Sequence, residues 1–368
     1  MSLALNGTNG ITYNDGSLQS SAIGKNLIIN GNMAIDQRNG GASVTPTSGD
    51  IYTIDRWEVS SNVSGKISIQ QVTTSPVGFA SSAKITSTSA YTIGASELVV
   101  YKQKIEGYNI SDLAWGTANA KTITISFWVR SSLTGTFGGA LNNNGSTRNY
   151  AFTYTISVAD TWEQKTITIP GDTTGTWLTT NGIGLSILIG LGVGTAFSGT
   201  AGSWSASFYA SATGATSVVG TSGATFYITG VQLEANTTAT PFENLQYGQQ
   251  LALCQRYYYK EKSTFAGQYF APNAYAISTT SAFTFNTFPV PMRTRPTALE
   301  QSGTASDYSL VRCGAGTSTI CNSVPTFGGS SLTIGQSVFS VASGLSNGFA
   351  GSGMSQSTNA YLAWSAEL

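Results

Sequence analysis

The sequence predicts an all-β protein built from β-sandwiches, and three observations carry that prediction. Apolar and polar residues alternate over many short stretches, which is the period of a strand with one buried face. Turn residues separate these stretches, and helical periodicity is almost absent. Only 9% of the 368 residues are charged, while 42 are glycine, 17 tyrosine and 16 phenylalanine. So many aromatic residues and so few charges argue against disorder and suit short strands joined by tight turns.

The length predicts two or three domains, each large enough to bury a core. We expect an N-terminal segment at 1–25, a β-sandwich at 26–243, a linking helix at 244–260 and a second β-domain at 261–368. Net charge is zero and no cluster of basic residues occurs. The sequence therefore predicts neither a nucleic-acid footprint nor a stretch suited to membrane insertion.

Residues 1–25 are polar and short of core-forming side chains. Such a segment needs a partner to order it, so attachment to another protein is one interpretation. A loose tail with a hairpin at Asn14-Asp15-Gly16 is the alternative. The N-terminus lacks the basic region and long apolar run of a signal peptide, which predicts folding in the cytosol of the producing cell.

The clearest strand runs from Ile123 to Arg130. One face carries four apolar residues, and the other carries Thr124, Ser126, Trp128 and Arg130. A large ring beside an arginine among hydroxyl groups can receive a sugar, by stacking on Trp128 and hydrogen bonding from Arg130. The alternative is that a loop or another subunit covers Trp128. Trp57, just inside an earlier strand, is expected in the core.

Two further stretches of the first domain read as strands. The most apolar part of an uncharged run, residues 182–197, is too short and too rich in glycine for a membrane span and predicts a buried strand or strand pair. Phe226 and Ile228 alternate with polar residues, and the apolar residues resume on the opposite parity after Gly230. That change predicts a β-bulge at the glycine.

The joint between the domains contains Thr240-Pro241-Phe242-Glu243, which has the pattern of a capping box. We expect a helix with Thr240 as its N-cap and Pro241 at its first position. Beyond it, apolar residues at helical spacing predict one buried stripe, formed by Tyr247, Leu251, Cys254 and Tyr258.

In the second domain, Phe283 and Phe285 are expected to share one face of a strand and Ala282, Thr284, Asn286 and Phe288 the other. Glycine, serine and asparagine dominate residues 314–353, which predicts long exposed loops. Tyr269 and Tyr275, close to Asn273, can present ring faces to a sugar, so they complete the set of candidate carbohydrate-binding residues.

The chain has no histidine and three cysteines, so it lacks the usual general base and the usual zinc ligands. We expect no catalytic residues, no metal site and no cofactor. Cys313 and Cys321 are placed to face each other on a hairpin, although a reducing cytosol disfavours a disulfide. Glycosidase chemistry with two carboxylates remains an alternative in principle, but no spacing in the sequence identifies a pair of Asp or Glu residues for it.

Several blocks of sequence resemble tailed-bacteriophage fibre and other virion surface proteins. The resemblance extends over nearly the whole chain. Its blocks are LNGTNGITYNDG, NLIINGNMAIDQRNGG with YTIDRWEV, SFWVRSS, ITGVQLE with TPFE and YGQQLALCQRYY, FPVPMRTRPT, and YLAWSAEL.

The resemblance implies a jelly-roll domain like that of carbohydrate-binding modules, a virion-attachment segment at 1–25, a homotrimer and a C-terminal receptor-binding tip. It implies a tail fibre on the virion surface that mediates adsorption to host cell-surface glycan. A head fibre, a capsid decoration protein or a tail connector without receptor binding is the alternative, and a glycan depolymerase is a further one.

Overall fold

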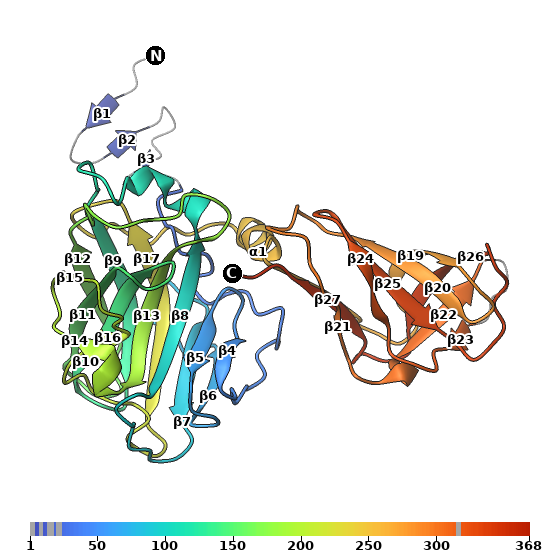
Figure 1. Cartoon of the computed structure of the whole chain (residues 1–368), viewed down its shortest axis with the longest axis horizontal. Coiled ribbons are helices and arrows are strands. Elements are labelled where there is room, and N and C mark those ends of the chain that lie inside the picture. Colours follow the sequence, from blue (N-terminus) through green and yellow to red (C-terminus); the bar gives the residue numbers. More distant parts are fainter. Residues whose placement is uncertain (1–3, 7–9, 13–17, 20–23, 314–317) are drawn as a thin grey trace. The chain divides into compact units, whose positions relative to one another are not determined.

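The computed structural model describes residues 4–6, 10–12, 18–19, 24–313 and 318–368 (Figure 1). These residues form an almost entirely β structure with one α-helix, so the predicted fold class is confirmed. The chain divides into two compact units, residues up to Tyr247 together with Leu368, and residues 248–367, called the first and second domains below. The hairpin considered at Asn14-Asp15-Gly16 lies outside the described residues. The described residues on either side of it in the sequence form a small sheet of three strands, β1 (Ala4–Asn6), β2 (Gly10–Thr12) and β3 (Leu18–Gln19).

The first domain is a sandwich of two antiparallel sheets (Figure 1). The seven-stranded sheet has the order β15 (Trp204–Ser205), β11 (Asn149–Ile156), β10 (Gly135–Asn143), β13 (Ile183–Val193), β8 (Leu98–Glu106), β5 (Glu58–Ser61), β4 (Gly49–Tyr52). The five-stranded sheet has the order β12 (Glu163–Ile169), β9 (Ile123–Ser131), β17 (Thr225–Glu234), β7 (Ser82–Ser87), β6 (Ile67–Val72). Most consecutive strands alternate between the sheets, as they do in a jelly roll.

Shorter elements complete this domain. A pair of parallel strands, β14 (Ser198–Gly199) and β16 (Ser211–Ala212), belongs to the segment between β13 and β17. Three 3-10 turns are η1 (Gly107–Asn109), η2 (Ser111–Leu113) and η3 (Thr195–Phe197).

The core of the first domain lies between the two sheets. The apolar face of β9 is fully buried there, as the alternation predicts, and so is most of β13. Trp57 is buried as expected and stacks on Tyr101 with ring centres 5.1 Å apart. The bulge expected in β17 is also present, because its register with β9 shifts between Thr229 and Gln232 while Gly230 has φ +62°.

The capping box predicted at Thr240 is not formed, because its two side chains bind elsewhere. The Thr240 hydroxyl donates to Glu234 Oε2 at 2.7 Å. The Glu243 carboxylate accepts the backbone N–H groups of Gly24 and Asn26. These bonds tie the start of the first domain to its end, so the expected helix start at Pro241 is wrong.

The helix is shorter than expected and begins later. It is α1 (Tyr247–Gln255), and Tyr258 belongs to a strand instead of the predicted apolar stripe. Within α1, Gln250 and Cys254 are buried, while Tyr247 is 66% exposed. The linking helix therefore does not extend to residue 260, and the second domain's sheets begin at Tyr258.

The second domain is also a sandwich of two sheets. The small sheet has the order β18 (Tyr258–Lys262), β27 (Tyr361–Ser365), β21 (Glu300–Gln301). The seven-stranded sheet has the order β23 (Ser318–Ile320), β22 (Tyr308–Arg312), β26 (Ala350–Ser355), β19 (Tyr269–Ala276), β20 (Ser281–Thr287), β25 (Ile334–Ser340), β24 (Thr326–Ser330). One 3-10 turn, η4 (Ala305–Asp307), precedes β22.

Trp364 and Tyr259 from the small sheet pack with Phe270, Tyr308 and Phe339 from the large one, which forms the second core. Because β24, β25 and β26 occupy much of residues 314–353, the prediction of long loops there is wrong. The predicted faces of β20 are confirmed, with Thr284 and Asn286 buried and Phe283 and Phe285 half-buried on the other side. All three cysteines are free thiols.

The junction between the domains should be the first site of proteolysis. Residues 246–249 are exposed, whereas Glu234 and Thr240 are held by hydrogen bonds. Limited digestion with chymotrypsin should therefore cut beside Tyr247 and release two folded fragments, identified by mass spectrometry and N-terminal sequencing. Earlier cleavage inside residues 26–233 would contradict this boundary.

Candidate functional site

A groove of about 130 Å³ lies on the outer face of the seven-stranded sheet of the first domain. The register places its residues side by side, because Ser60 faces Val100, Leu188 faces Lys102 and Ser186 faces Asn142 on neighbouring strands. The complete lining is Ser60, Leu98, Val100, Lys102, Asn142, Ser146, Ser186, Leu188 and Phe208.

One wall of the groove comes from the segment between β13 and β17, which crosses the outer face of the sheet. Phe208 of this segment packs edge-to-face on Phe197, and both rings rest on Val100 and Leu188. This segment approaches the sheet closely at glycine positions, where no side chain separates the two. A Cβ added at Gly138 would lie 2.3 Å from the Ser211 Oγ, so glycine is required there.

Asn142 lies in the lining of the groove and binds the crossing segment. Its side chain belongs to a residue that is only 3% exposed, and its Nδ2 donates to the Tyr209 carbonyl at 3.3 Å. Its Oδ1 accepts no hydrogen bond from any residue that the structure describes. This oxygen is itself buried, so the Asn142 side chain anchors the crossing segment and does not offer its oxygen to a ligand.

The charged groups beside the groove neutralise one another. Lys102 and Lys104 each lie within 3.3 Å of both Asp50 and Glu58. Burial raises the pKa of Glu58, and the two lysine charges oppose that shift only in part. Burial also acts to raise the pKa of Asp50, but a hydrogen bond from Ser60 and the charges of Lys102 and Lys104 outweigh it and lower this pKa. The balanced cluster favours an uncharged ligand in the groove.

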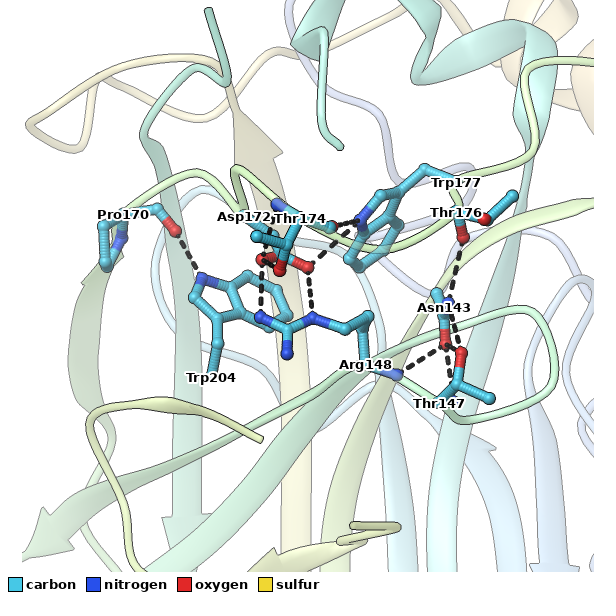
Figure 2. Close-up of polar contacts among 9 residues, drawn as sticks. All are labelled: Asn143, Thr147, Arg148, Pro170, Asp172, Thr174, Thr176, Trp177 and Trp204. Carbon is cyan, nitrogen blue, oxygen red and sulfur yellow. Dashed lines mark hydrogen bonds and ion pairs between the residues drawn. The ribbon is translucent and has the colours of Figure 1, made fainter. Parts of the chain in front are cut away.

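The turn between β10 and β11 forms the rim of the groove and contains Ser146, which has φ +55°. Asn143 holds this turn, because its Oδ1 accepts the backbone N–H groups of Thr147 and Arg148 at 2.9 Å. Its Nδ2 donates to the Thr176 carbonyl in the loop after β12 (Figure 2). The turn is therefore fixed to a second loop instead of being free at the end of the sheet.

Arg148 completes the attachment of this turn. Its guanidinium makes two hydrogen bonds to Asp172, of 2.7 and 2.6 Å, and Asp172 also accepts the Trp177 indole N–H at 3.2 Å (Figure 2). The Asp172 side chain is 2% exposed. Burial acts to raise its pKa, but the bonds from Arg148, Thr174 and Trp177 more than offset that effect and lower the pKa.

Three tryptophan rings pack beside this ion pair. Trp115, Trp177 and Trp204 pack edge-to-face with ring centres 4.6 to 5.6 Å apart. The Trp204 indole donates to the Pro170 carbonyl at 2.9 Å, and Arg148 lies over its ring (Figure 2). Arg148 lies over the Trp204 ring, and Asp172 accepts the Trp177 indole N–H. Because the rings and the ion pair contact each other in this way, we interpret the cluster as a structural support of the groove's rim.

The sequence-predicted residues Trp128 and Arg130 lie on the outer face of the five-stranded sheet, away from the groove. Both are half-buried. Arg130 already pairs with Asp160 at 3.3 Å and lies over the Tyr227 ring. A Cβ at Gly230 would touch both Phe79 and Trp128, so the loop carrying Phe79 reaches this part of the sheet.

Tyr269 and Tyr275 belong to the second domain, whereas Trp128 and Arg130 belong to the first. They are 63% and 43% exposed on β19. Tyr275 packs on Phe283 and Phe285, with ring centres 5.6 and 6.1 Å from its own. These rings share the outer face of β19 and β20.

Sequence reasoning missed Asn142 and Ser186 because their importance depends on strand register. One signal was present, since the outward positions of β10 are Gly138, Ala140 and Asn142, all small or polar. Small residues on one face of a strand are typical of sites where another chain segment approaches. Within the described ranges, no group of His, Cys, Asp and Glu residues is placed to hold a metal ion, and no helix is long and apolar enough to span a membrane.

No protein-family model and no curated protein sequence matches the chain. Solved structures with a similar arrangement include the enzymatically active domain of tailspike protein 4 of bacteriophage CBA120, with TM-score 0.31 and 11% identity over 57% of this chain. The match spans only 21% of that tailspike chain.

Two further similar structures are matched over all or nearly all of their own chains. A putative sugar binding protein from Bacteroides thetaiotaomicron has TM-score 0.35 and 13% identity, covering 58% of this chain and 100% of its own. A family 11 carbohydrate-binding module of a Clostridium thermocellum cellulase has TM-score 0.28 and 13% identity, covering 54% and 98%. At such low TM-scores, these likenesses identify neither a ligand nor a role for this chain.

Replacing the buried carboxylate should loosen the rim of the groove. Asp172→Asn leaves Arg148 without its partner, and we expect a loss of about 3 kcal/mol in the free energy of unfolding at pH 7. Because the native pKa of Asp172 is lowered, the stabilisation is present above the ordinary pKa of about 3.9 and is lost as pH falls through the lowered value. Urea unfolding at several pH values measures both effects.

The control is Asp112→Asn, which breaks an exposed pair with Lys121. It should cost less than about 1 kcal/mol. Equal losses in the two variants, or a gap between wild type and Asp172→Asn that does not narrow in acid, would refute the assigned role of Asp172.

Proposed function

We propose that the chain is a non-enzymatic fibre protein of a tailed-phage virion that binds an uncharged cell-surface glycan through the groove of its first domain. The observation that supports glycan binding best is a groove that combines serine hydroxyl groups with an apolar wall and whose neighbouring charges are balanced. The virion role is supported by the sequence blocks that resemble phage fibre proteins.

The chemistry of the groove suits a sugar ring. Sugars present hydroxyl groups, which donate and accept hydrogen bonds, beside apolar C–H faces. Ser60, Ser146 and Ser186 offer hydroxyl groups that can donate and accept hydrogen bonds. Leu98, Val100, Leu188 and Phe208 offer the apolar surface.

The size of the groove suits one sugar unit. A cavity needs about 10–15 Å³ to hold a water molecule. A space of about 130 Å³ therefore accommodates on the order of ten non-hydrogen atoms, which is close to one hexopyranose. A single unit binds weakly, so a homotrimer would raise the avidity for a surface that repeats its glycans.

A binding role is favoured over a depolymerase by the state of the carboxylates at the groove. Glu58 has the raised pKa expected of a general acid, but its side chain has no exposed surface and is held by Lys102 and Lys104. A general acid must reach the glycosidic oxygen. In this proposal residues 1–25 attach the chain to the virion, and the second domain contributes to adsorption.

Filling the groove should abolish binding without unfolding the protein. Ser186 is half-buried at the groove, so Ser186→Trp would occupy the sugar's volume. A second variant, Ser60→Ala combined with Ser186→Ala, removes two hydroxyl groups from the lining. Screening the full chain on an array of neutral bacterial-surface oligosaccharides should identify a ligand, and both variants should weaken its binding about tenfold or more. The matched control, Thr166→Trp, places the same ring on an exposed position of β12 and should bind normally.

Failure of the purified chain to bind any array glycan or host cell would overturn the glycan-binding proposal and favour a head fibre, decoration or connector role. Equal weakening by Thr166→Trp would also count against the groove. Antibody labelling of intact virions separates tail from head, and release of reducing ends from a bound glycan would reveal depolymerase activity.

A further inference from the structure

The large sheet of the second domain has a row of side chains with aromatic rings on its outer face. Tyr275 of β19 is opposite Phe283 of β20, and Phe283 is opposite Val338 of β25. Thr326 of β24 continues the row opposite Val338. Side chains paired in this way lie on one face of a sheet. Because neighbouring strands are about 4.8 Å apart, the row extends for about 14 Å across four strands, which is longer than a single sugar ring.

The rings of this row hold one another in place. Tyr275 is 43% exposed and packs edge-to-face on Phe283, and its ring plane lies 15° from that of Phe285. Phe285 is two residues beyond Phe283, so both rings are on the same face of β20. Because the rings are already packed, a ligand can stack on them without first ordering them. We call Tyr275, Phe283, Phe285 and Val338 the aromatic face.

In the strands that the structure describes, the outer face of this sheet has no charged side chain. Residues 263–292 and 313–366 contain no Asp, Glu, Lys or Arg, and they include every strand of the sheet except β22. Arg312 of β22 shares its face with Leu310, which is buried in the core, and lies over the Phe349 ring. A charged ligand would lose hydration on the aromatic face without gaining an ionic partner, so the face favours an uncharged ligand.

Polar groups border the aromatic face. Gln336 of β25 is opposite Phe285, and its side chain extends over β24, where a Cβ at Gly328 would lie 2.8 Å from its Oε1. Ser281 and Ser340 pair with each other on the other side of the row. Amide and hydroxyl groups beside ring faces match a sugar, which presents hydroxyl groups around an apolar C–H face. This mixture favours a glycan over the apolar surface of another protein.

We propose that the aromatic face binds an uncharged stretch of a surface polysaccharide, with successive sugar units stacked on its three rings. The amide and hydroxyl groups at its border bind hydroxyl groups of the same units. That the ligand is a glycan rests on the proposed function, whereas the preference for several uncharged units rests on the length of the row and its lack of charge. The chain would then carry two glycan sites that differ in the length of sugar chain they recognise.

The experiment compares short and long neutral probes on the full chain. The probes are neutral bacterial-surface oligosaccharides from the array, each prepared as a disaccharide and as a chain of six units. In Ser186→Trp, which fills the groove, calorimetry should show no measurable binding of the disaccharide and a residual binding of the long probe. Added salt should leave this residual binding unchanged, because the aromatic face has no charge to be screened.

Removing one ring should weaken the residual binding of the long probe. Added to Ser186→Trp, Tyr275→Thr and Phe285→Thr should each weaken it about fivefold. Tyr275→Phe keeps the ring and should retain most of the binding. The matched control is Tyr108→Thr, which removes a ring that is 59% exposed in the first domain and should bind like its parent. Melting temperatures establish that each variant is folded, and Tyr275→Thr, whose ring is exposed, decides the test if Phe285→Thr does not fold.

Normal binding of the long probe by Tyr275→Thr, or equal weakening by Tyr108→Thr, would overturn the proposal. So would separation of copies of the chain in sedimentation by Tyr275→Thr with unchanged glycan binding, because the face would then be a contact between copies.

The two sites fail separately. Loss of all glycan binding in Ser186→Trp would support the groove and overturn the role of the aromatic face. Weakening by Tyr275→Thr without any effect of Ser186→Trp would support the aromatic face and overturn the role of the groove. Absence of binding to every neutral probe by the unaltered chain would overturn both.

Discussion

The close approach of a chain segment to the backbone of a sheet is the contact on which the first domain's surface depends. Gly138 and Gly190 both lie under Ser211. At each of these positions a Cβ would come within 2.8 Å of the crossing segment. Because glycine has no side chain, the segment packs directly on the backbone of the sheet. Phe208 is therefore held beside Leu188 and forms one wall of the groove.

Local sequence patterns predicted the strands well where one face is buried against a core. The alternation in β9, the bulge at Gly230 and the burial of Trp57 all follow from periodicity and backbone geometry. The patterns failed where a side chain had two possible partners. Glu243 has the spacing of a capping residue, yet it binds Gly24 and Asn26, which are distant in the sequence.

The groove could not be predicted for a related reason. Ser186 and Asn142 are 44 positions apart and become neighbours only through the pairing of β10 with β13. The composition also led to a wrong prediction. The glycine and serine residues of 314–353 were interpreted as loops, although many of them belong to strands with small side chains. Glycine marks flexible turns and closely approached strands alike, and the sequence alone does not separate these uses.

The bonds that join the two ends of the first domain determine how the molecule carries mechanical load. Leu27 donates its N–H to the Leu233 carbonyl, and Asn26 Oδ1 accepts the Leu233 N–H, beside the Glu243 contacts. The chain thus enters and leaves the sandwich at one point. A pulling force between residues 1–25 and the chain after Glu243 acts first on these bonds. Leu368 is a second point of attachment to the sandwich, because its oxygen accepts hydrogen bonds from Tyr52 of β4 and Lys104 of β8.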